Sequence, residues 1–363
     1  MSLTGNKGEW SELYVLLKLL ATGKLYAADE NTQPLGNLYF PIKKIFRKEG
    51  SGIHTHNIEY HLRDEGQVDV IVNTILVNRV SHEQLTSDSE TVLRQIVNGG
   101  DRSFYLVGSE SIMNRLSCDR IKAPSSDKTD ITLLLHDIHT GFEPICGFSI
   151  KSDLGMPPTL LNASCATNFR YQVKNLPEGE YLNINNIETK NKIIDRISSI
   201  YSLGGKLTFR YVVNEVFERN LTMIDSRMME ILSCILLYYY KERISSCADL
   251  ANRLEDDNPL NMRTRGFYTY KLKKFLCAVA LGLTPTSQWD GTEEANGGYI
   301  VIGENGSVLA YHIYNRDRFE KYLLNHTKLE TASSSRHHYA TIFQEDQNYY
   351  IDLNLQIRFI GHG

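Results

Sequence analysis

The sequence predicts an α/β (α+β) protein, with strands towards both ends of the chain and helices in the middle. Alternating and β-branched residues, the pattern of strands, run from Leu38 to Val80 and return towards the C-terminus. Between these regions, residues 186–281 place apolar side chains at helical spacing. Two apolar runs, residues 131–138 and 142–150, flank Thr140-Gly141 and predict a β-hairpin. A chain of 363 residues is long enough for one large domain or two moderate ones.

The first predicted element is a helix from Asn6 to Leu20. Asn6 is a good N-cap residue and Glu9 follows at the spacing of a capping box, which gives Glu9 a structural explanation. Glu12 lies past the capping positions at the edge of the apolar face. It is therefore either a partly exposed boundary residue or a carboxylate directed at a metal ion. The apolar face is formed by Trp10, Leu13, Leu17 and Leu20.

The next segments alternate between strands and short helices. His54 and His56 have a spacing that suits metal binding, but no third ligand accompanies them, and exposed strand histidines explain them better. The predicted elements are strands at residues 38–46, 57–63, 68–77 and 104–107 and helices at 87–97 and 109–116.

The hairpin carries the residues of greatest chemical interest. A turn centred on Thr140-Gly141 places Asp130 opposite Lys151, and Thr132 opposite Ser149. Side chains alternate between faces, so these four residues share one face and a carboxylate meets an ammonium across two strands. A single bulge would change this register.

Hydrolysis of a phosphodiester needs a divalent metal to neutralise the phosphate and activate water, and a cation to orient that water or stabilise charge. Asp130 and Lys151 are of the right types for these tasks. The structural alternative is that Asp130 begins a strand and Lys151 is a solvated strand end, since both residue types are common and their spacing is loose.

Two later segments are rich in hydrogen-bonding side chains. Asn162, Thr167 and Asn168 either contact phosphates and base edges or cap turns. The polar loop at residues 328–339 contains Arg336 and His337. Arginine is the commonest reader of guanine, but from these residues alone a flexible surface loop is the better explanation of this segment.

The order of these elements divides the chain into three consecutive regions. Residues 1–185 hold the first helix and the hairpin, residues 186–285 are helical, and residues 286–363 are rich in β-structure. The last region contains the polar loop, so we expect DNA recognition there.

Composition excludes several classes of protein. The net charge of −4 argues against a protein that coats nucleic acid non-specifically. Six cysteines without a Cys-x-x-Cys pair argue against a structural zinc site and fit the reducing cytoplasm. No apolar run is long enough to span a bilayer, so we expect no membrane partner. The absence of a Walker A loop and of a Gly-x-Gly-x-x-Gly motif leaves nucleotide-driven chemistry without support.

Several short segments, spread from the first helix to the last hairpin, together resemble one enzyme family. They are Gly8-Glu9-Trp10-Ser11-Glu12, Thr129-Asp130, residues 147–152, residues 158–163, Thr167-Asn168-Phe169, residues 311–315 and Ser335-Arg336-His337. In these segments the chain resembles the HpaII family of type II restriction endonucleases. That family is similar to the PD-(D/E)xK nucleases, so the resemblance implies a mixed β-sheet core flanked by helices.

The resemblance also implies roles for individual residues. Asp130 would bind Mg²⁺, Lys151 would position or activate the attacking water, and the carbonyl of Ile150 would complete the metal shell. Ser149 stands where the usual second acid lies, two residues before the lysine. Relatives of this kind often take the missing carboxylate from the first helix through a Gly-x-x-x-Glu pattern. Residues 8–12 match it, so Glu12 is the candidate and Glu9 the second choice.

These observations predict a Mg²⁺-dependent endonuclease that cuts double-stranded DNA at a short site, with CCGG and a companion DNA methyltransferase implied by the resemblance. A palindromic site would suit a homodimer. Three alternatives remain: a repair or nicking nuclease of the same core, a non-catalytic DNA-binding or regulatory protein, and a metallohydrolase using His54 and His56.

Overall fold

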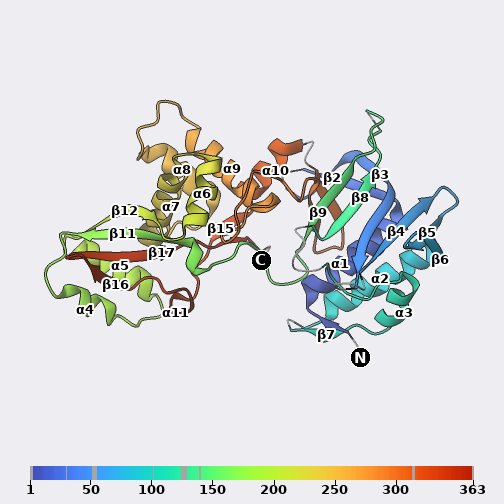
Figure 1. Cartoon of the computed structure of the whole chain (residues 1–363), viewed down its shortest axis with the longest axis horizontal. Coiled ribbons are helices and arrows are strands. Elements are labelled where there is room, and N and C mark those ends of the chain that lie inside the picture. The colour runs from blue at the N-terminus through green and yellow to red at the C-terminus, as the bar shows by residue number, and fades with distance from the viewer. Residues whose placement is uncertain are drawn as a thin grey trace. The chain divides into compact units, whose positions relative to one another are not determined.

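The computed structural model describes residues 3–29, 31–50, 55–100, 102–123, 129–138, 140–312 and 315–361, except for the side chains of Asn37 and His312. The chain forms two compact units, each discontinuous in sequence. Unit 1 contains residues 1–158, 294–319 and 361–363, and unit 2 contains residues 159–293 and 320–360 (Figure 1). The three consecutive regions expected from the sequence were drawn from its composition, whereas these two units are defined by contacts. The division into three regions stays a prediction.

Unit 1 is built on a mixed sheet that is nine-stranded among the described residues, with the order β2-β14-β13-β9-β8-β3-β4-β5-β6. An additional pairing of β2 with β3 closes part of this sheet on itself. The strands are β2 (Lys24–Ala28), β3 (Pro34–Glu49), β4 (His56–Arg63), β5 (Gln67–Val72), β6 (Ile75–Ser81), β8 (Ile131–Leu135), β9 (Ile145–Ser152), β13 (Gly298–Ile302) and β14 (Val308–His312). Helices α1 (Lys7–Thr22), α2 (His82–Asn98) and α3 (Ser109–Arg115) and the small strands β1 (Thr4–Gly5) and β7 (Phe104–Tyr105) complete the unit.

Helix α1 is the centre of the unit 1 core. The expected capping box forms: the Glu9 N–H donates to Asn6 Oδ1 at 3.0 Å and the Asn6 N–H donates to Glu9 Oε2 at 2.9 Å. Trp10 is fully buried and its Nε1 donates to the Phe104 carbonyl at 3.1 Å. The buried hydroxyls of Ser11 and Ser152 lie 2.8 Å apart, so α1 is joined to β9 beside the position of Glu12.

The β8–β9 hairpin forms, but its predicted register is wrong by two residues. Thr132 pairs with Gly147, not Ser149, and the N–H of Asp130 donates to the Phe148 carbonyl at 2.9 Å. The strands end earlier than expected, at Leu135 and Ile145, and the Asp137 N–H donates to the Phe142 carbonyl at 2.9 Å within the connection, in agreement with the shifted register. A shift of two preserves the alternation of faces, so the residues expected to share a face still do so.

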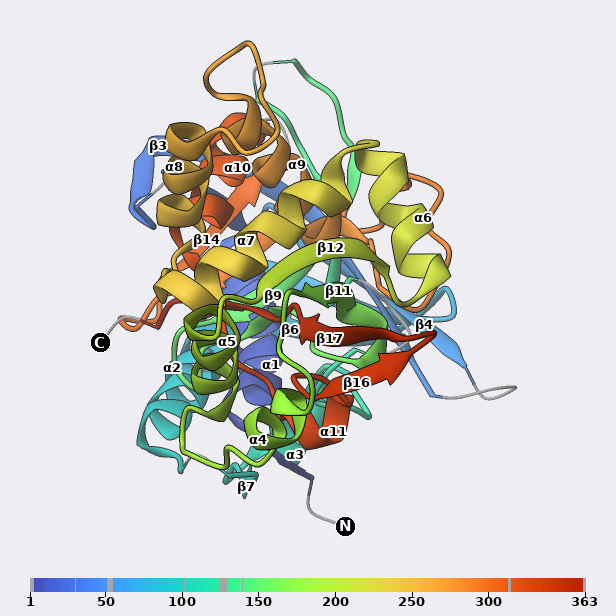
Figure 2. The same ribbon diagram turned by 90° about the vertical axis from the view of Figure 1, so that its left-hand side faces the viewer.

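Unit 2 contains the predicted helical region and two further sheets. Helix α7 (Met228–Glu242) lies beside the larger sheet of this unit (Figure 2). The Tyr171 hydroxyl on β11 (Asn168–Lys174) donates to the Ser233 carbonyl on α7 at 2.8 Å, which joins the sheet to the helix. The larger sheet has the order β12-β11-β17-β16 and the smaller one β10-β18-β15. Their strands are β10 (Thr159–Leu161), β11 (Asn168–Lys174), β12 (Lys206–Val212), β15 (Thr327–Leu329), β16 (Ile342–Glu345), β17 (Asn348–Asn354) and β18 (Ile357–Phe359). The helices are α4 (Glu180–Asn185), α5 (Lys192–Ser202), α6 (Glu215–Ile224), α7 (Met228–Glu242), α8 (Cys247–Asp257), α9 (Phe267–Leu281) and α11 (Ser334–His337), while α10 (Arg316–Asn325) contains the boundary between the units.

The α/β fold class expected from the sequence is confirmed by these sheets and helices. Whether unit 1 is a PD-(D/E)xK core stays a prediction. None of the described helices combines the length and apolar character needed to cross a bilayer.

Candidate active site

Asp130 stands at the start of β8, next to the middle of β9. Its Oδ2 accepts a hydrogen bond from the Ile150 N–H at 2.6 Å and another from Ser149 Oγ at 3.0 Å. In a strand, the N–H and C=O of one residue point to the same edge, so the Ile150 carbonyl also faces the edge on which Asp130 lies. The carboxylate is therefore held in place by the neighbouring strand.

Lys151 is connected to Asp130 through Ser149. Lys151 Nζ donates to Ser149 Oγ at 3.0 Å, and the same hydroxyl donates to Asp130. The ammonium lies 5.0 Å from the ring centroid of Tyr299 on β13. Burial lowers the pKa of Lys151, against the opposing charges of Asp130 and Glu12. This lysine is thus more easily deprotonated than one in water.

Glu12 is the second carboxylate of the site. Its Oε2 accepts a hydrogen bond from the Ala123 N–H at 2.9 Å. Burial, and next the charge of Asp130, raise the pKa of Glu12 to about 8. The two acids are therefore close enough to repel each other when both are ionised.

Glu9, the second choice for this role, is engaged elsewhere. Besides forming the capping box, its Oε1 accepts a hydrogen bond from Lys122 Nζ at 2.6 Å. Burial acts to raise the pKa of Glu9, but the bonds from Lys122 and from the Asn6 backbone lower it overall. The capping role inferred from the sequence therefore accounts for Glu9.

The donor set around Asp130 suits one kind of metal site. The described residues contain no group of three or more His, Cys, Asp or Glu side chains arranged to hold a metal ion. Mg²⁺ commonly takes only one or two carboxylates and completes its shell with water and phosphate oxygens. Asp130 and Glu12, whose mutual repulsion a cation would relieve, fit such an open site.

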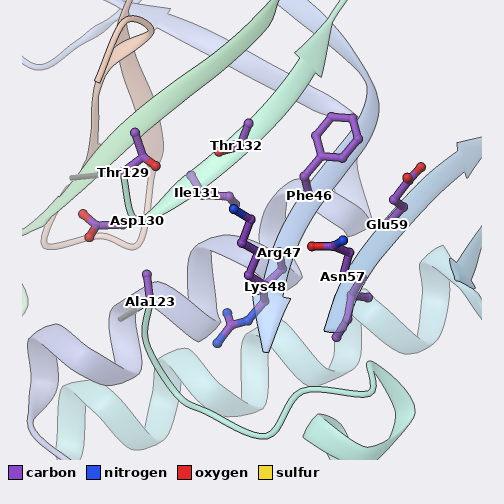
Figure 3. A pocket seen from close by; sticks show the side chains of 11 residues that line it. Phe46, Arg47, Lys48, Asn57, Glu59, Ala123, Thr129, Asp130, Ile131 and Thr132 are labelled. Atoms are coloured by element: carbon purple, nitrogen blue, oxygen red, sulfur yellow. The ribbon is translucent and has the colours of Figure 1, made fainter. Parts of the chain in front are cut away.

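A cavity of about 410 Å³ opens beside Asp130 (Figure 3). Arg47, on its wall, is neutralised by an ion pair with the fully buried Glu49 and donates to the Arg120 carbonyl at 2.5 Å. Lys48 is the other cation of the lining. The remaining lining residues are Phe46, Asn57, Ile58, Glu59, Ala123, Thr129, Ile131 and Thr132.

Neither Arg47 nor Lys48 was singled out from the sequence. Both lie on β3, far from the hairpin along the chain, and only the pairing of β3 with β8 brings them to the site.

The histidines considered from the sequence give no metal centre among the described residues. His56 lies 3.8 Å from Asp119 and His61 lies 2.7 Å from Glu59, so each has a carboxylate neighbour. His54 lies outside the described residues.

The predicted DNA contacts all belong to unit 2. Asn162 and Arg336 are exposed, and His337, at the end of α11, is half-buried. Thr167 and Asn168 are instead buried, at 0% and 3% exposure.

The two buried residues belong to a network that supports α11. Asn354 Nδ2 donates to Asn168 Oδ1 at 2.7 Å and to Thr167 Oγ1 at 3.1 Å. Asn168 Nδ2 in turn donates to the His337 carbonyl at 2.9 Å. A direct contact of Thr167 or Asn168 with DNA would break these bonds, so holding the loop is the role that their surroundings favour.

Comparison with known proteins identifies the family of this chain. No solved structure matches the chain. The type II restriction enzyme HpaII of Haemophilus parainfluenzae is 39% identical to it over 361 residues, which cover 98% of this chain and 99% of that enzyme. A model of the HpaII restriction endonuclease family matches residues 6–359. This chain therefore belongs to the HpaII restriction endonuclease family and is a site-specific endonuclease, a hydrolase.

Proposed function

We propose that this endonuclease cuts both strands of DNA at a short specific sequence by Mg²⁺-dependent hydrolysis, with its chemistry at Asp130. The observation that carries the proposal is the hydrogen-bonded series from Lys151 through Ser149 to Asp130, with Glu12 close enough to sense the charge of Asp130. Two carboxylates can hold a divalent metal and a lysine can orient water, and these are the tasks that metal-dependent phosphodiester hydrolysis needs.

Asp130, Glu12 and the carbonyl of Ile150 would hold the Mg²⁺, which when bound neutralises the phosphate and lowers the pKa of water. The Ile150 N–H and the Ser149 hydroxyl fix the carboxylate of Asp130 before DNA arrives. Such preorganisation means that little rearrangement is needed during the reaction.

Lys151 orients the attacking water and accepts or shares its proton. Its lowered pKa favours this task, since a lysine is a base only when deprotonated. Ser149 replaces a carboxylate as the link between Lys151 and Asp130 and supplies no negative charge of its own. The second acid therefore comes from α1, as Glu12.

We propose CCGG as the recognition sequence, on the likeness to the HpaII family. Arg336 and Asn162, which are exposed, and His337 are the candidates for contact with DNA. Thr167 and Asn168 support the α11 loop from within. Protection of host DNA by a companion methyltransferase, action as a homodimer on a palindrome and location in the cytoplasm belong to the same proposal.

The decisive experiment is digestion of a sequenced plasmid with and without Mg²⁺, with Asp130→Asn and Lys151→Ala beside the parent protein. We expect discrete fragments that require Mg²⁺ and a loss of cleavage of at least roughly 10²- to 10⁴-fold in either variant. The ends of the fragments would map the site. Folding, followed by circular dichroism, and binding of a duplex containing the mapped site should survive both substitutions.

Other outcomes would identify the alternatives. Nicks in one strand, or ends at lesions and not at a sequence, would point to a nicking or repair nuclease. DNA binding without cleavage at any divalent metal would leave a binding or regulatory protein, in which Asp130 and Lys151 form an ordinary cross-strand pair contributing about 0.2 to 1 kcal/mol.

A further inference from the structure

Strand pairing puts a lysine on each side of Asp130. In the β3–β8 ladder Phe46 pairs with Thr132, and continuing this register to the end of β8 brings Lys48 opposite Asp130. On the other side, the β8–β9 ladder brings Ser149, the partner of Lys151, opposite the same aspartate. Lys48 and Asp130 both line the 410 Å³ cavity (Figure 3).

Lys48 differs from the cations around it in lacking a carboxylate partner. Lys44 lies 3.4 Å from Glu59, Arg47 pairs with Glu49, and Lys122 lies 2.6 Å from Glu9. Lys48 is exposed and forms no ion pair with any residue that the structure describes. Its full positive charge is therefore available to a ligand that enters the cavity.

Besides Asp130 and Glu59, whose carboxylate is paired with Lys44 and His61, the lining carries groups that can donate hydrogen bonds to an anion with several acceptor oxygens. The Thr129 and Thr132 hydroxyls and the Asn57 amide supply neutral donors beside Lys48. A phosphate of the DNA backbone is such an anion, and lysine, hydroxyl and amide side chains are its usual partners. The half-buried Phe46 adds apolar surface on which a sugar can pack.

The positive charge of Lys48 can offset the repulsion between the carboxylates of the site and DNA. Asp130 and Glu12 are carboxylates that repel a polyanion such as DNA. A Mg²⁺ ion would neutralise only the phosphate bound to it. A lysine placed across from Asp130 offsets the repulsion for the neighbouring phosphate and fixes the path of the strand.

We infer that Lys48 binds a DNA backbone phosphate next to the phosphodiester held at Asp130, and thus positions the strand for cleavage. The inference rests on the proposed function. It assigns Lys48 to binding and leaves proton transfer to Lys151, so loss of Lys48 raises KM and not the apparent pKa of the reaction.

The test measures binding of the full-length protein to a duplex containing the mapped site across a series of salt concentrations. Lys48→Met and Lys48→Gln are compared with Lys48→Arg, each combined with Asp130→Asn so that the duplex stays intact. Lys43→Met is the matched control, because Lys43 lies on the same strand, is exposed and does not line the cavity.

We expect Lys48→Met and Lys48→Gln to weaken binding about 10-fold and to reduce the slope of log K against log salt by about 0.9, the value for one phosphate contact. Lys48→Arg should keep most of both, and Lys43→Met should change neither. In the Asp130-containing protein, Lys48→Met should raise KM while the pH profile of cleavage stays in place.

Two failures are distinguishable. If the parent protein cuts DNA but folded Lys48→Met and Lys48→Gln variants bind with unchanged affinity and salt slope, this inference is overturned and the proposed function stands. If the parent protein cuts no DNA under any divalent metal, the proposed function fails instead.

Discussion

Ser149 joins a carboxylate and an ammonium through a single hydroxyl. Because it donates to Asp130 and accepts from Lys151, each at 3.0 Å, both reactive groups are oriented by one side chain. A carboxylate in its place would add a third acid near Asp130 and Glu12. With a neutral link, the metal-free site carries less repulsion between like charges.

Glu12 should make the metal-free protein less stable at alkaline pH. Its pKa rises on folding from 4.5 to about 8, so between these values the folded state holds a proton that the unfolded chain has released. The free energy of unfolding therefore falls as the pH rises through this window, by an amount on the order of 2 to 4 kcal/mol.

The measurement is thermal unfolding in EDTA at pH 5 and pH 8, for the parent and for Glu12→Gln. The variant should lose less stability between the two pH values than the parent does, since its amide does not titrate. Equal losses in the two proteins would show that Glu12 is not the titrating group. Adding Mg²⁺ at pH 8 should stabilise the parent more than the variant.

The sequence reached the residues of this site unequally. Asp130 and Lys151 have suitable side chains, but their loose spacing alone favours a structural reading, and the resemblance to the HpaII family is what assigned them and Glu12 to the site. Glu9 became the second choice because a capping box explains it. Lys48 carries no such signal. Its place beside Asp130 depends on pairing between strands far apart in the chain, which spacing does not encode.

At the scale of elements, Gly147 lets β9 approach the start of β8. A Cβ atom added there would lie 2.4 Å from Thr129 Cγ2 and 3.3 Å from the Glu294 carbonyl oxygen. The backbone is tied on both sides, since the Gly147 N–H donates to Asn296 Oδ1 and its carbonyl accepts from the Gly297 N–H, both at 2.8 Å. Thr129 directly precedes Asp130, so crowding there would displace the carboxylate proposed for catalysis.

Gly147→Ala should therefore lower cleavage by displacing Thr129, with a loss of roughly 1 to 3 kcal/mol in stability. The double variant Gly147→Ala, Thr129→Ser removes the crowded methyl group and should recover much of the activity. Steady-state cleavage of the mapped duplex and thermal unfolding measure both effects. Full activity of Gly147→Ala alone would mean that β8 and β9 accommodate the added methyl group without moving Asp130.

The β8–β9 hairpin shows which features of an element the local sequence pattern predicts and which it does not. The two apolar runs and the turn at Gly141, which has a positive φ of 74°, identified both strands. The register was missed because loop hydrogen bonds, such as that from the Gly141 N–H to the Asp137 carbonyl at 2.8 Å, set it. Faces were still assigned correctly, because an error of two residues leaves the alternation unchanged.

At the scale of the whole molecule, the candidate residues divide between two units. Those proposed for chemistry lie in unit 1 and those proposed for recognition lie in unit 2. The sequence did not predict this division, because residues 294–319 join unit 1 through the parallel pairing of β13 with β9, a contact between distant segments. A change in composition marks a boundary between neighbouring segments of the chain, but it does not show which distant segments contact each other.

This division predicts that discrimination and chemistry are separable. Arg336→Ala should reduce the preference for the cognate site over a site with one changed base pair by roughly 1 to 3 kcal/mol. Asp130→Asn should leave that preference unchanged while abolishing cleavage. Competition binding with cognate and single-substituted duplexes measures the difference. Unaltered discrimination in Arg336→Ala would remove this residue from the recognition surface, and Arg318→Ala, in α10, serves as a control of the same type.

The pairing of β9 with β13 also bears on the order in which the parts of the proposed site are synthesised. Tyr299, whose ring lies 5.0 Å from the Lys151 ammonium, belongs to β13, the strand paired with β9, and is translated almost 150 residues after that lysine. Until then β9 has an unfilled edge, and a nascent chain carries the acids and the lysine without the frame that aligns them. A nascent chain would therefore lack the frame of the proposed site until β13 has been synthesised.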